Sequence, residues 1–173
     1  MTDFATPGPT DRWHVVESPI GDLLLTGDGR ALTGLRMLAA GRGAAEAPPG
    51  HRHDPAAFAD AEEQLHEYFG GTLTTFDLRL APSGTAFQLD VWHALTEVPY
   101  GETASYGEIA RRVDRPDAPR AVGAANGQNP IAVIVPCHRI IGSTGSLTGF
   151  GGGLERKRLL LDLEAGLLPL TAA

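Results

Sequence analysis

Apolar residues in the first 80 positions fall in short stretches separated by turn-forming residues, a pattern that predicts β-strands. The expected strands are residues 13–17, 23–26, 31–37 and 74–80. Residues 39–50 are mainly glycine, alanine and proline and predict a surface loop. Asp54 and Pro55 then open a helix that ends at Gly70 and Gly71. Its apolar residues share one side: Phe58, Leu65 and Phe69. This half is therefore predicted to be a sheet with one helix.

The second half carries stronger local signals for helices. Thr85 and Gln88 have the spacing of a capping box, in which two side chains bond the first free backbone N–H groups. They predict a helix over residues 86–97. Ser105 and Glu108 repeat the same spacing and open a shorter helix, with Ile109 and Val113 pointing inward.

A tight turn over residues 114–118 separates this short helix from the next one, which begins at Pro119 and runs to about residue 128. Two short helices joined in this way resemble a helix-turn-helix, although other helical hairpins share the spacing. Residues 131–135 are an apolar, β-branched run that predicts a buried strand or extended segment. Residues 142–153 predict a loop, and a last helix over 154–165 ends at Gly166.

Together these elements predict an α+β fold with two domains. Residues 1–80 form an N-terminal domain of a β-sheet plus a helix, and residues 81–85 a linker. Residues 86–173 form a mostly helical C-terminal domain that contains the helix-turn-helix. We found no internal repeats.

Charge separates the two halves. The chain has a net charge of −7, which disfavours binding to nucleic acid if the charge is spread evenly. Residues 1–104, however, hold six basic and 15 acidic side chains, whereas residues 105–158 hold eight basic and four acidic ones. The predicted helix-turn-helix therefore lies in a segment of net charge +4, which can approach a polyanion.

A single cysteine, Cys137, excludes a fold held by internal disulfides and favours a reducing compartment. Residues 1–10 lack the basic and apolar segments of a secretory signal, and the apolar runs are too short to cross a bilayer. We therefore expect a cytoplasmic protein.

Cys137 lies in the sequence PCHR, beside a base and a fixed cation. A free thiol has a pKa of about 8.5, so attack on carbon needs His138 or Arg139 to favour the thiolate. A remote carboxylate would orient the imidazole, as in a triad. The alternative is that Cys137 is a small buried residue at the end of an apolar run, and local chemistry leaves the two interpretations equally open.

Five segments with collinear spacing resemble the O6-alkylguanine-DNA alkyltransferases. They are IAVIVPCHRII (131–141), VPYGETASYGEIA (98–110), RAVGAANGQN (120–129), GFGGGL (149–154) and LLDLE (160–164). The resemblance covers residues 85–165, whereas the first 80 residues match only in general plan. It implies irreversible, stoichiometric transfer of an alkyl group, such as methyl, from O6-alkylguanine in DNA to Cys137, after the base is flipped out of the duplex.

The resemblance also assigns roles to single residues. It implies that His138 takes the proton of Cys137 through a water, that Glu164 holds the imidazole, and that Asn129 braces the turn. Tyr106 would donate a proton or hydrogen bond to guanine N3. The pocket would include the carbonyl oxygens of Cys137 and Ile140 for the guanine amino group, the ring of Phe150, and the amide of Gly151 near O6. Phe150 stands where relatives often have tyrosine, and Gly151 where serine can occur.

For DNA, the resemblance implies that the second helix of the helix-turn-helix enters the minor groove and that Arg120 fills the space left by the flipped base. The small residues of that helix suit this approach, although tight core packing would also explain some of them: Ala121, Gly123, Ala124, Ala125 and Gly127. Asn126 and Arg139 are further expected DNA contacts. Basic residues 156–158 open the last helix, where they would contact phosphate or pair with Glu155 or Asp162.

No cofactor or metal is expected. Zinc sites in some alkyltransferases need cysteines, which this chain lacks outside Cys137, and His51 and His53 would bind a metal weakly at most. The expected partner is double-stranded DNA containing O6-alkylguanine, with no membrane, bound by a monomer whose cooperativity on DNA stays open. Two alternatives are a non-enzymatic protein that flags alkylated guanine and a cysteine hydrolase. The first class lacks the acceptor cysteine, and the second leaves the DNA-binding half unexplained.

Overall fold

Three of the four strands predicted for the first half form one sheet in the computed structural model, which describes residues 4–39 and 47–167. The sheet has the order β3-β2-β1-β4, and only β1 and β4 pair in parallel. Its strands are β1 (Arg12–Val16), β2 (Leu23–Gly27), β3 (Leu32–Met37) and β4 (Arg52–His53). The short β4 was not predicted. Most of the predicted surface loop, residues 40–46, lies outside the described residues.

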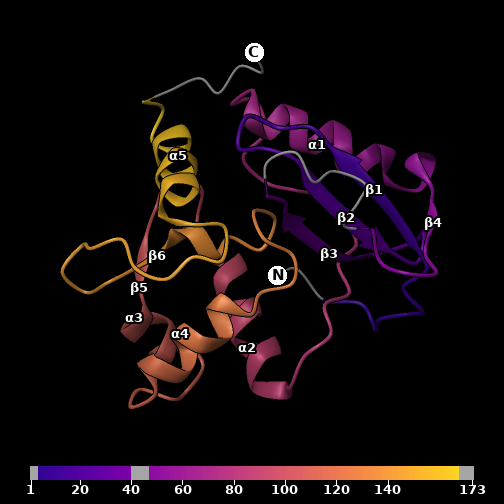
Figure 1. Cartoon of the computed structure of the whole chain (residues 1–173). Helices are drawn as coiled ribbons and strands as arrows, with labels where there is room; N and C mark the ends of the chain where they lie inside the picture. Colours follow the sequence, from indigo (N-terminus) through magenta and orange to yellow (C-terminus); the bar gives the residue numbers. More distant parts are fainter. Residues whose placement is uncertain (1–3, 40–46, 168–173) are drawn as a thin grey trace.

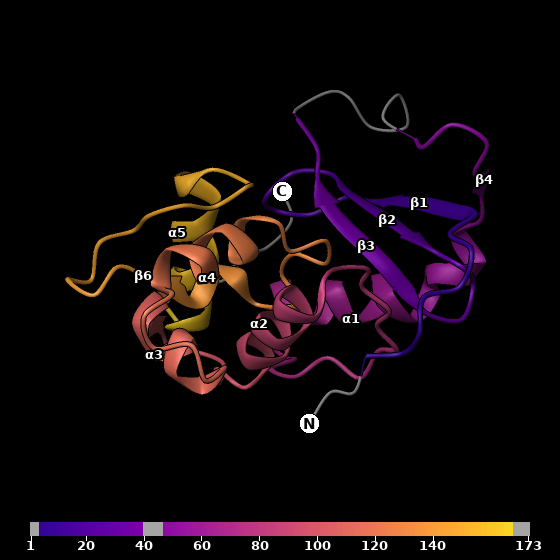
Figure 2. The same ribbon diagram turned by 90° about the horizontal axis from the view of Figure 1, so that it is seen from below.

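One helix, α1 (Ala59–Phe69), lies along one face of this sheet and follows a short 3₁₀ turn, η2 (Pro55–Phe58), as Figures 1 and 2 show. Its buried side is made by Ala61, Leu65, Tyr68 and Phe69. Strand β2 contributes Leu23 and Leu25, both fully buried. The strand and helix patterns read from the sequence therefore place their apolar sides against each other.

The prediction of a strand over residues 74–80 is wrong. Only Leu80 makes a bridge, to Leu32 of β3. The reason is a competing partner: the Gln64 side chain of α1 both donates to the carbonyl of Asp77 and accepts from its N–H, at 3.0 and 2.8 Å. Because this side chain satisfies the Asp77 backbone, the segment follows the helix as irregular chain and adds no fifth strand.

Short helices make up the second half, as predicted. They are α2 (Ala86–Thr96), α3 (Tyr106–Arg112), α4 (Pro119–Gly127) and α5 (Leu154–Glu164). Both predicted capping boxes are present, at Thr85 and at Ser105. The indole N–H of Trp92 in α2 donates to the carbonyl of Ala125 in α4 at 2.9 Å and fixes α4 against the core. The α+β fold class is thus confirmed.

The apolar run at residues 131–135 is buried but is not a strand. Ile131 makes one bridge to Leu35, after which the chain folds back on itself, with the N–H of Val135 donating to the carbonyl of Ile131 at 2.9 Å. Val133 takes a positive φ of 72°, an unusual conformation for a β-branched residue. The chain then forms a 3₁₀ turn, η3 (Cys137–Arg139), and strand β6 (Ile140–Ile141) beside β5 (Ala104–Ser105).

Strand β3 joins the two halves. The N–H of Leu35 donates to the carbonyl of Pro130 at 2.8 Å, and the N–H of Ala132 donates to the carbonyl of Leu35 at 3.1 Å. Buried residues of both halves belong to one hydrophobic cluster. The division of the chain at residues 81–85 stays a prediction. No helix in residues 4–39 and 47–167 is long and apolar enough to cross a membrane.

Candidate active site and DNA-binding surface

Asn129 holds together the turn that leads to Cys137. Its side-chain amide donates to the carbonyl of Val135 at 2.8 Å, and its oxygen accepts from the N–H of Ile131 at 3.0 Å. The two bonds close a loop of seven residues and thereby hold the positive φ of Val133. The chain turns directly at Cys137, so its side chain and that of the next residue do not alternate as they would in a strand.

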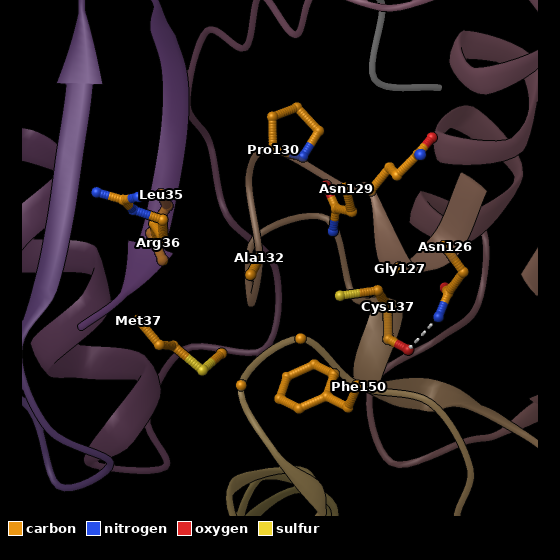
Figure 3. A pocket seen from close by; sticks show the side chains of 13 residues that line it. Leu35, Arg36, Met37, Asn126, Gly127, Asn129, Pro130, Ala132, Cys137 and Phe150 are labelled. Atoms are coloured by element: carbon orange, nitrogen blue, oxygen red, sulfur yellow. Dashed lines mark hydrogen bonds between the residues drawn. The ribbon is translucent and has the colours of Figure 1, made fainter. Parts of the chain in front are cut away.

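Cys137 lines a cavity of about 280 Å³, and Figure 3 shows its sulfur pointing into this space. The other walls come from three segments: residues 35–37 of β3, residues 126–130 with Ala132, and residues 150–152. Cys137 is only 4% exposed, so the cavity is its route to a reactant. Phe150 and Gly151, both expected in the pocket, belong to its wall.

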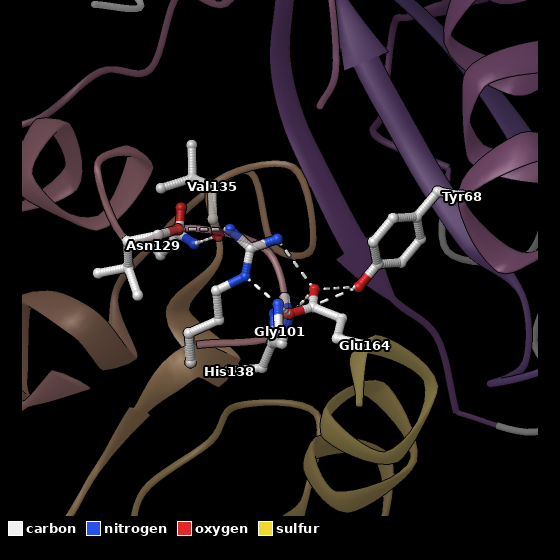
Figure 4. A network of polar contacts seen from close by, with 8 residues as sticks. Tyr68, Gly101, Asn129, Val135, His138 and Glu164 are labelled. Atoms are coloured by element: carbon white, nitrogen blue, oxygen red, sulfur yellow. Dashed lines mark hydrogen bonds and ion pairs between the residues drawn. The ribbon is translucent and has the colours of Figure 1, made fainter. Parts of the chain in front are cut away.

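The residue after Cys137, His138, is bonded to a buried carboxylate, Glu164 (Figure 4). Oε1 of Glu164 is 2.8 Å from Nε2 of His138, and both side chains are fully buried. Arg139 donates from Nε and Nη2 to the two carboxylate oxygens, each at 2.9 Å, and from Nη1 to the carbonyl of Val98 at 2.6 Å. Gly101 N–H donates to Oε2 at 3.2 Å. Glu164 is therefore surrounded by donors.

This arrangement fixes the tautomer of the neutral histidine. Burial alone would raise the pKa of Glu164, but hydrogen bonds from His138 and Arg139 and their charges lower that pKa to about 2. The ionised carboxylate only accepts hydrogen bonds, so Nε2 of His138 carries the proton. Nδ1 is then the basic atom, and it is buried without a hydrogen-bond partner among the described residues.

Burial also shifts the two groups that would exchange a proton. It raises the pKa of the Cys137 thiol, against a hydrogen bond with Asn129 and the charge of Lys157. It lowers the pKa of His138, against the hydrogen bond and charge of Glu164. Both shifts favour a neutral thiol beside a neutral imidazole at rest.

Lys157 is a buried cation of α5 that the sequence analysis placed on the surface. It is 0% exposed and donates to the carbonyl oxygens of Ile140 and Thr148. Its neighbour Arg156 donates to the carbonyl of Leu38 at 2.8 Å. For these two residues, both earlier interpretations, phosphate contact and a solvated ion pair, are replaced by bonds to backbone. The bonds tie α5 to the loop after Cys137 and to the end of β3.

Tyr106 and Ile140 lie beside the cavity but outside the residues that line it. The Tyr106 hydroxyl donates to the carbonyl of Thr148 at 3.0 Å. The carbonyl of Ile140 accepts from Lys157, and that of Cys137 accepts from Asn126 and from the N–H of Ile140. The groups expected to bind guanine therefore hold partners within the protein in this structure.

Helix α4 presents small residues to solvent. Arg120, Ala121 and Ala124 are exposed, whereas Ala125 is buried in the core. Core packing therefore explains Ala125, as the alternative interpretation of this helix held. Gly123 faces Tyr106 of α3, where an added Cβ would lie 3.6 Å from the ring. The exposed side of α4 is thus narrow, with a cation in its first turn.

Two residues expected to contact DNA are buried and hydrogen-bonded within the protein in this structure. Asn126 is 2% exposed and its amide donates to the carbonyl of Cys137 at 3.3 Å, so it stabilises the turn at the cysteine. Arg139 is 7% exposed, and its guanidinium donates to the carboxylate of Glu164 and to the carbonyl of Val98. Neither side chain is free to reach a DNA groove.

Tyr68 was missed by the sequence analysis. Its hydroxyl donates to Oε1 of Glu164 at 2.6 Å, although it comes from α1, 96 residues earlier. Its position beside Leu65 and Phe69 on the apolar side of the helix looks like ordinary core. Lys157 did leave a signal, because it shares a helix side with Leu160 and Glu164 at helical spacing.

No three histidine, cysteine, aspartate or glutamate residues gather to hold a metal ion within the described part of the chain. The ring of His53 instead packs against that of Trp13, and its Nε2 lies 3.1 Å from Nδ1 of His14.

The fold and site define a class of protein in which a helix with a narrow exposed side contacts a turn that carries a buried thiol, followed in sequence by a histidine bonded to a buried carboxylate. Two family models match the chain, the DNA binding domain of 6-O-methylguanine DNA methyltransferase at residues 86–166 and its ribonuclease-like domain at residues 12–82. The chain belongs to the 6-O-methylguanine DNA methyltransferase family.

Relatives with this activity in their names are similar over almost the whole chain. The methylated-DNA–protein-cysteine methyltransferase of Mycobacterium bovis is 54% identical over 160 residues, 91% of this chain and 94% of its own. That of Methanosarcina acetivorans is 51% identical over 88% and 97%. A crystal structure of Mycobacterium tuberculosis OGT in complex with DNA matches with a TM-score of 0.85 and 53% identity, over 91% and 95% of the two chains.

Proposed function

We propose that Cys137 is the residue that becomes alkylated in this member of the family. The family repairs DNA by moving the alkyl group of O6-alkylguanine to a protein cysteine, and this chain has only one cysteine. The observation that carries the assignment is that Cys137 lines the cavity and directly precedes His138, whose imidazole is bonded to the buried Glu164.

The transfer is a displacement at the alkyl carbon. His138 takes the thiol proton at Nδ1 through a bridging water, and its Nε2–H remains bonded to Glu164. The thiolate sulfur forms a bond to the alkyl carbon as the bond from that carbon to O6 breaks, and the electron pair leaves with the guanine. Tyr106 neutralises the leaving base by giving a proton or hydrogen bond to N3, and solvent later restores the hydroxyl. The thioether is stable, so each molecule acts once.

DNA binds along the exposed side of α4. Ala121 and Ala124 allow this helix to lie in the minor groove, and Arg120 enters the base stack where the alkylated nucleotide has turned out. A flipped base costs a few kcal/mol of stacking and pairing, part of which Arg120 offsets. Support comes from the crystal structure of the Mycobacterium tuberculosis relative, which is a complex with DNA. We place this activity in a monomer.

In the pocket, the base stacks on Phe150, and the amide of Gly151 faces O6. The carbonyl oxygen of Ile140 accepts from the guanine amino group with its second lone pair, since it already accepts from Lys157. The carbonyl oxygen of Cys137 already accepts from Asn126 and from the N–H of Ile140, so the guanine amino group replaces one of these donors there. Phe150 supplies only a ring, without the hydroxyl that tyrosine would add. No cofactor takes part, and we place the protein in the cytoplasm, where a lone thiol stays reduced.

Intact-mass measurement after reaction with a duplex containing O6-methylguanine tests the assignment. We expect one added methylene per molecule, located on the peptide that contains Cys137. The Cys137→Ser variant should bind the same duplex and leave it methylated. An unchanged mass with tight binding would instead favour the non-enzymatic alternative, and repair by the serine variant would exclude Cys137 as the acceptor.

A further inference from the structure

Tyr68 brings α1, a helix packed on the N-terminal sheet, into the hydrogen-bond network behind the cysteine. Its hydroxyl is 2.6 Å from Oε1 of Glu164 and 3.5 Å from Nε2 of His138 (Figure 4). The side chain is 0% exposed. Three aromatic rings surround it within 6.0 Å: Phe69, Phe76 and Tyr100. The ring is therefore held firmly, and its hydroxyl has a fixed direction.

The carboxylate oxygen that Tyr68 meets is crowded. Oε1 of Glu164 accepts from Tyr68, from Nε2 of His138 and from Nη2 of Arg139, at 2.6, 2.8 and 2.9 Å. A carboxylate oxygen has two lone-pair sites, so three donors share them. Each donor withdraws negative charge from the oxygen, and the shortest of the three bonds is the one from Tyr68. Tyr68 and His138 therefore compete for the same acceptor.

From this geometry we propose that Tyr68 is a positioning residue that sets the basicity of His138 through Glu164. It fixes the carboxylate and limits the negative charge that the imidazole meets. The imidazole then stays neutral at rest and is free to take the thiol proton. This proposal rests on the relay proposed above, in which His138 is the base for Cys137.

Among the charged and titratable groups around His138, the Tyr68 hydroxyl keeps its proton and donates in every state of the histidine. These groups are Tyr68 of α1, Tyr100, Cys137 and Arg139 near η3, and Lys157 and Glu164 of α5. Burial, together with the nearby Glu164 charge, raises the pKa of Tyr68 well above its ordinary value. Its hydroxyl therefore keeps its proton throughout the range in which a histidine titrates, and donates to Glu164 in both states of His138.

The pH dependence of alkyl transfer tests this role. A protonated His138 cannot accept the thiol proton, so the rate falls on the acid side with the pKa of that residue. Tyr68→Phe removes one donor from Oε1, and the carboxylate charge that remains stabilises the imidazolium more strongly. We expect the midpoint of the acid side to move upward by about 0.5–1 pH unit, because Glu164 loses one charge-assisted bond and only part of that effect reaches the histidine.

Single-turnover transfer from a methylated duplex would be measured from pH 5 to 9, with the folded fraction followed by circular dichroism at each pH. Tyr100→Phe is the matched control, because it removes a hydroxyl from the same cluster for which the structure shows no hydrogen bond to Glu164. Its midpoint should stay at the wild-type value. A Tyr68→Phe profile equal to that of wild type, with only a lower unfolding temperature, would reduce Tyr68 to a packing role and overturn the proposal.

Two further variants keep the test decisive. If Tyr68→Phe folds poorly, site-specific 3-fluorotyrosine at position 68 keeps the ring and strengthens the donor, so the midpoint should move down; no movement refutes the role. His138→Gln should slow transfer and remove the inflection that belongs to the histidine, so that the rate rises with pH over the whole range as the thiol ionises without a base. If this variant keeps the wild-type midpoint, the relay itself is wrong and the Tyr68 proposal is overturned with it. If the inflection is lost and Tyr68→Phe has no effect, only the Tyr68 proposal is overturned.

Discussion

Replacement of Arg139 by methionine separates two interpretations of this residue. Next to the cysteine and within the cationic segment, it was expected to contact DNA. In the structure it is buried, and its guanidinium makes two bonds to Glu164 and one to the carbonyl of Val98. Methionine fills much of the same volume without charge or donors. The variant therefore removes the electrostatic role of Arg139 and leaves a packed side chain.

The structure predicts a large loss of stability. Glu164 would keep its bonds from Tyr68, His138 and Gly101, but it would lose the only fixed cation that touches it among the described residues. Removing one partner of a buried ion pair costs about 3–5 kcal/mol, because the other charge stays buried. For a protein of this length each kcal/mol lowers Tm by about 2–4 °C. We expect Tm to fall by roughly 6–20 °C.

Urea unfolding and DNA binding together decide the question. Fluorescence polarisation with a methylated duplex, at a temperature where the variant is folded, should give an affinity within about twofold of the parent, measured on the Cys137→Ser background. The double variant with Glu164→Gln should regain part of the stability, because no unpaired charge remains. Arg120→Met is the matched control: its surface position predicts a stability change within about 0.5 kcal/mol and weaker binding.

The opposite pattern would refute the structural argument. If Arg139→Met unfolds at nearly the urea concentration of the parent and binds DNA many times more weakly, Arg139 is a DNA contact after all. The burial of its guanidinium would then not describe the protein that meets DNA.

Three other predictions follow from the site. Because the folded state lowers the pKa of both His138 and Glu164, the unfolded chain binds more protons, so the urea midpoint should fall as the pH drops below 6.5 and again between 4.5 and about 2; His138→Gln should lack the first decline. Lys157→Met removes the cation that favours the Cys137 thiolate, so iodoacetamide should alkylate the thiol more slowly; an equal rate would show that this charge does not act on it. Asn129→Ala breaks both bonds across the turn and should cost about 1–3 kcal/mol of stability in urea and slow methyl transfer more than it weakens DNA binding; equal effects on transfer and binding would count against its role at the turn.

Local signals were reliable where the structure depends on local bonds. Thr85 and Ser105 each bond to a residue three positions later, so the capping boxes could be read directly from the sequence. The strand expected at residues 74–80 failed for the opposite reason. Its backbone partner is the side chain of Gln64, 13 residues away, and no feature of the segment itself reveals this competitor.

The same distinction holds in the site. Cys137 and His138 are neighbours in the chain, so their chemistry could be weighed from the sequence, whereas Glu164 was found only through resemblance. Arg139 was expected at DNA because of its neighbours in sequence, whereas in the structure it is bonded to a carboxylate 25 residues later. Tyr68 comes from 70 residues before the histidine and left no signal at all, since a tyrosine on an apolar helix side is ordinary core.

The pKa shifts of Cys137 and His138 determine how reactive the thiol is at rest, which matters in a protein that acts once. Burial raises the pKa of Cys137 and lowers that of His138, so at rest the proton stays on sulfur. A permanent thiolate would react with any small electrophile or oxidant, and each such event would consume a molecule that cannot be regenerated. In the proposed relay, proton transfer to His138 creates two opposite charges: the charge of Lys157 favours the thiolate, and that of Glu164 favours the imidazolium. Under that proposal, displacement of the guanine draws the transfer forward only when an alkyl carbon is in the cavity. The buried site therefore restricts a high reactivity to the moment at which the substrate is present.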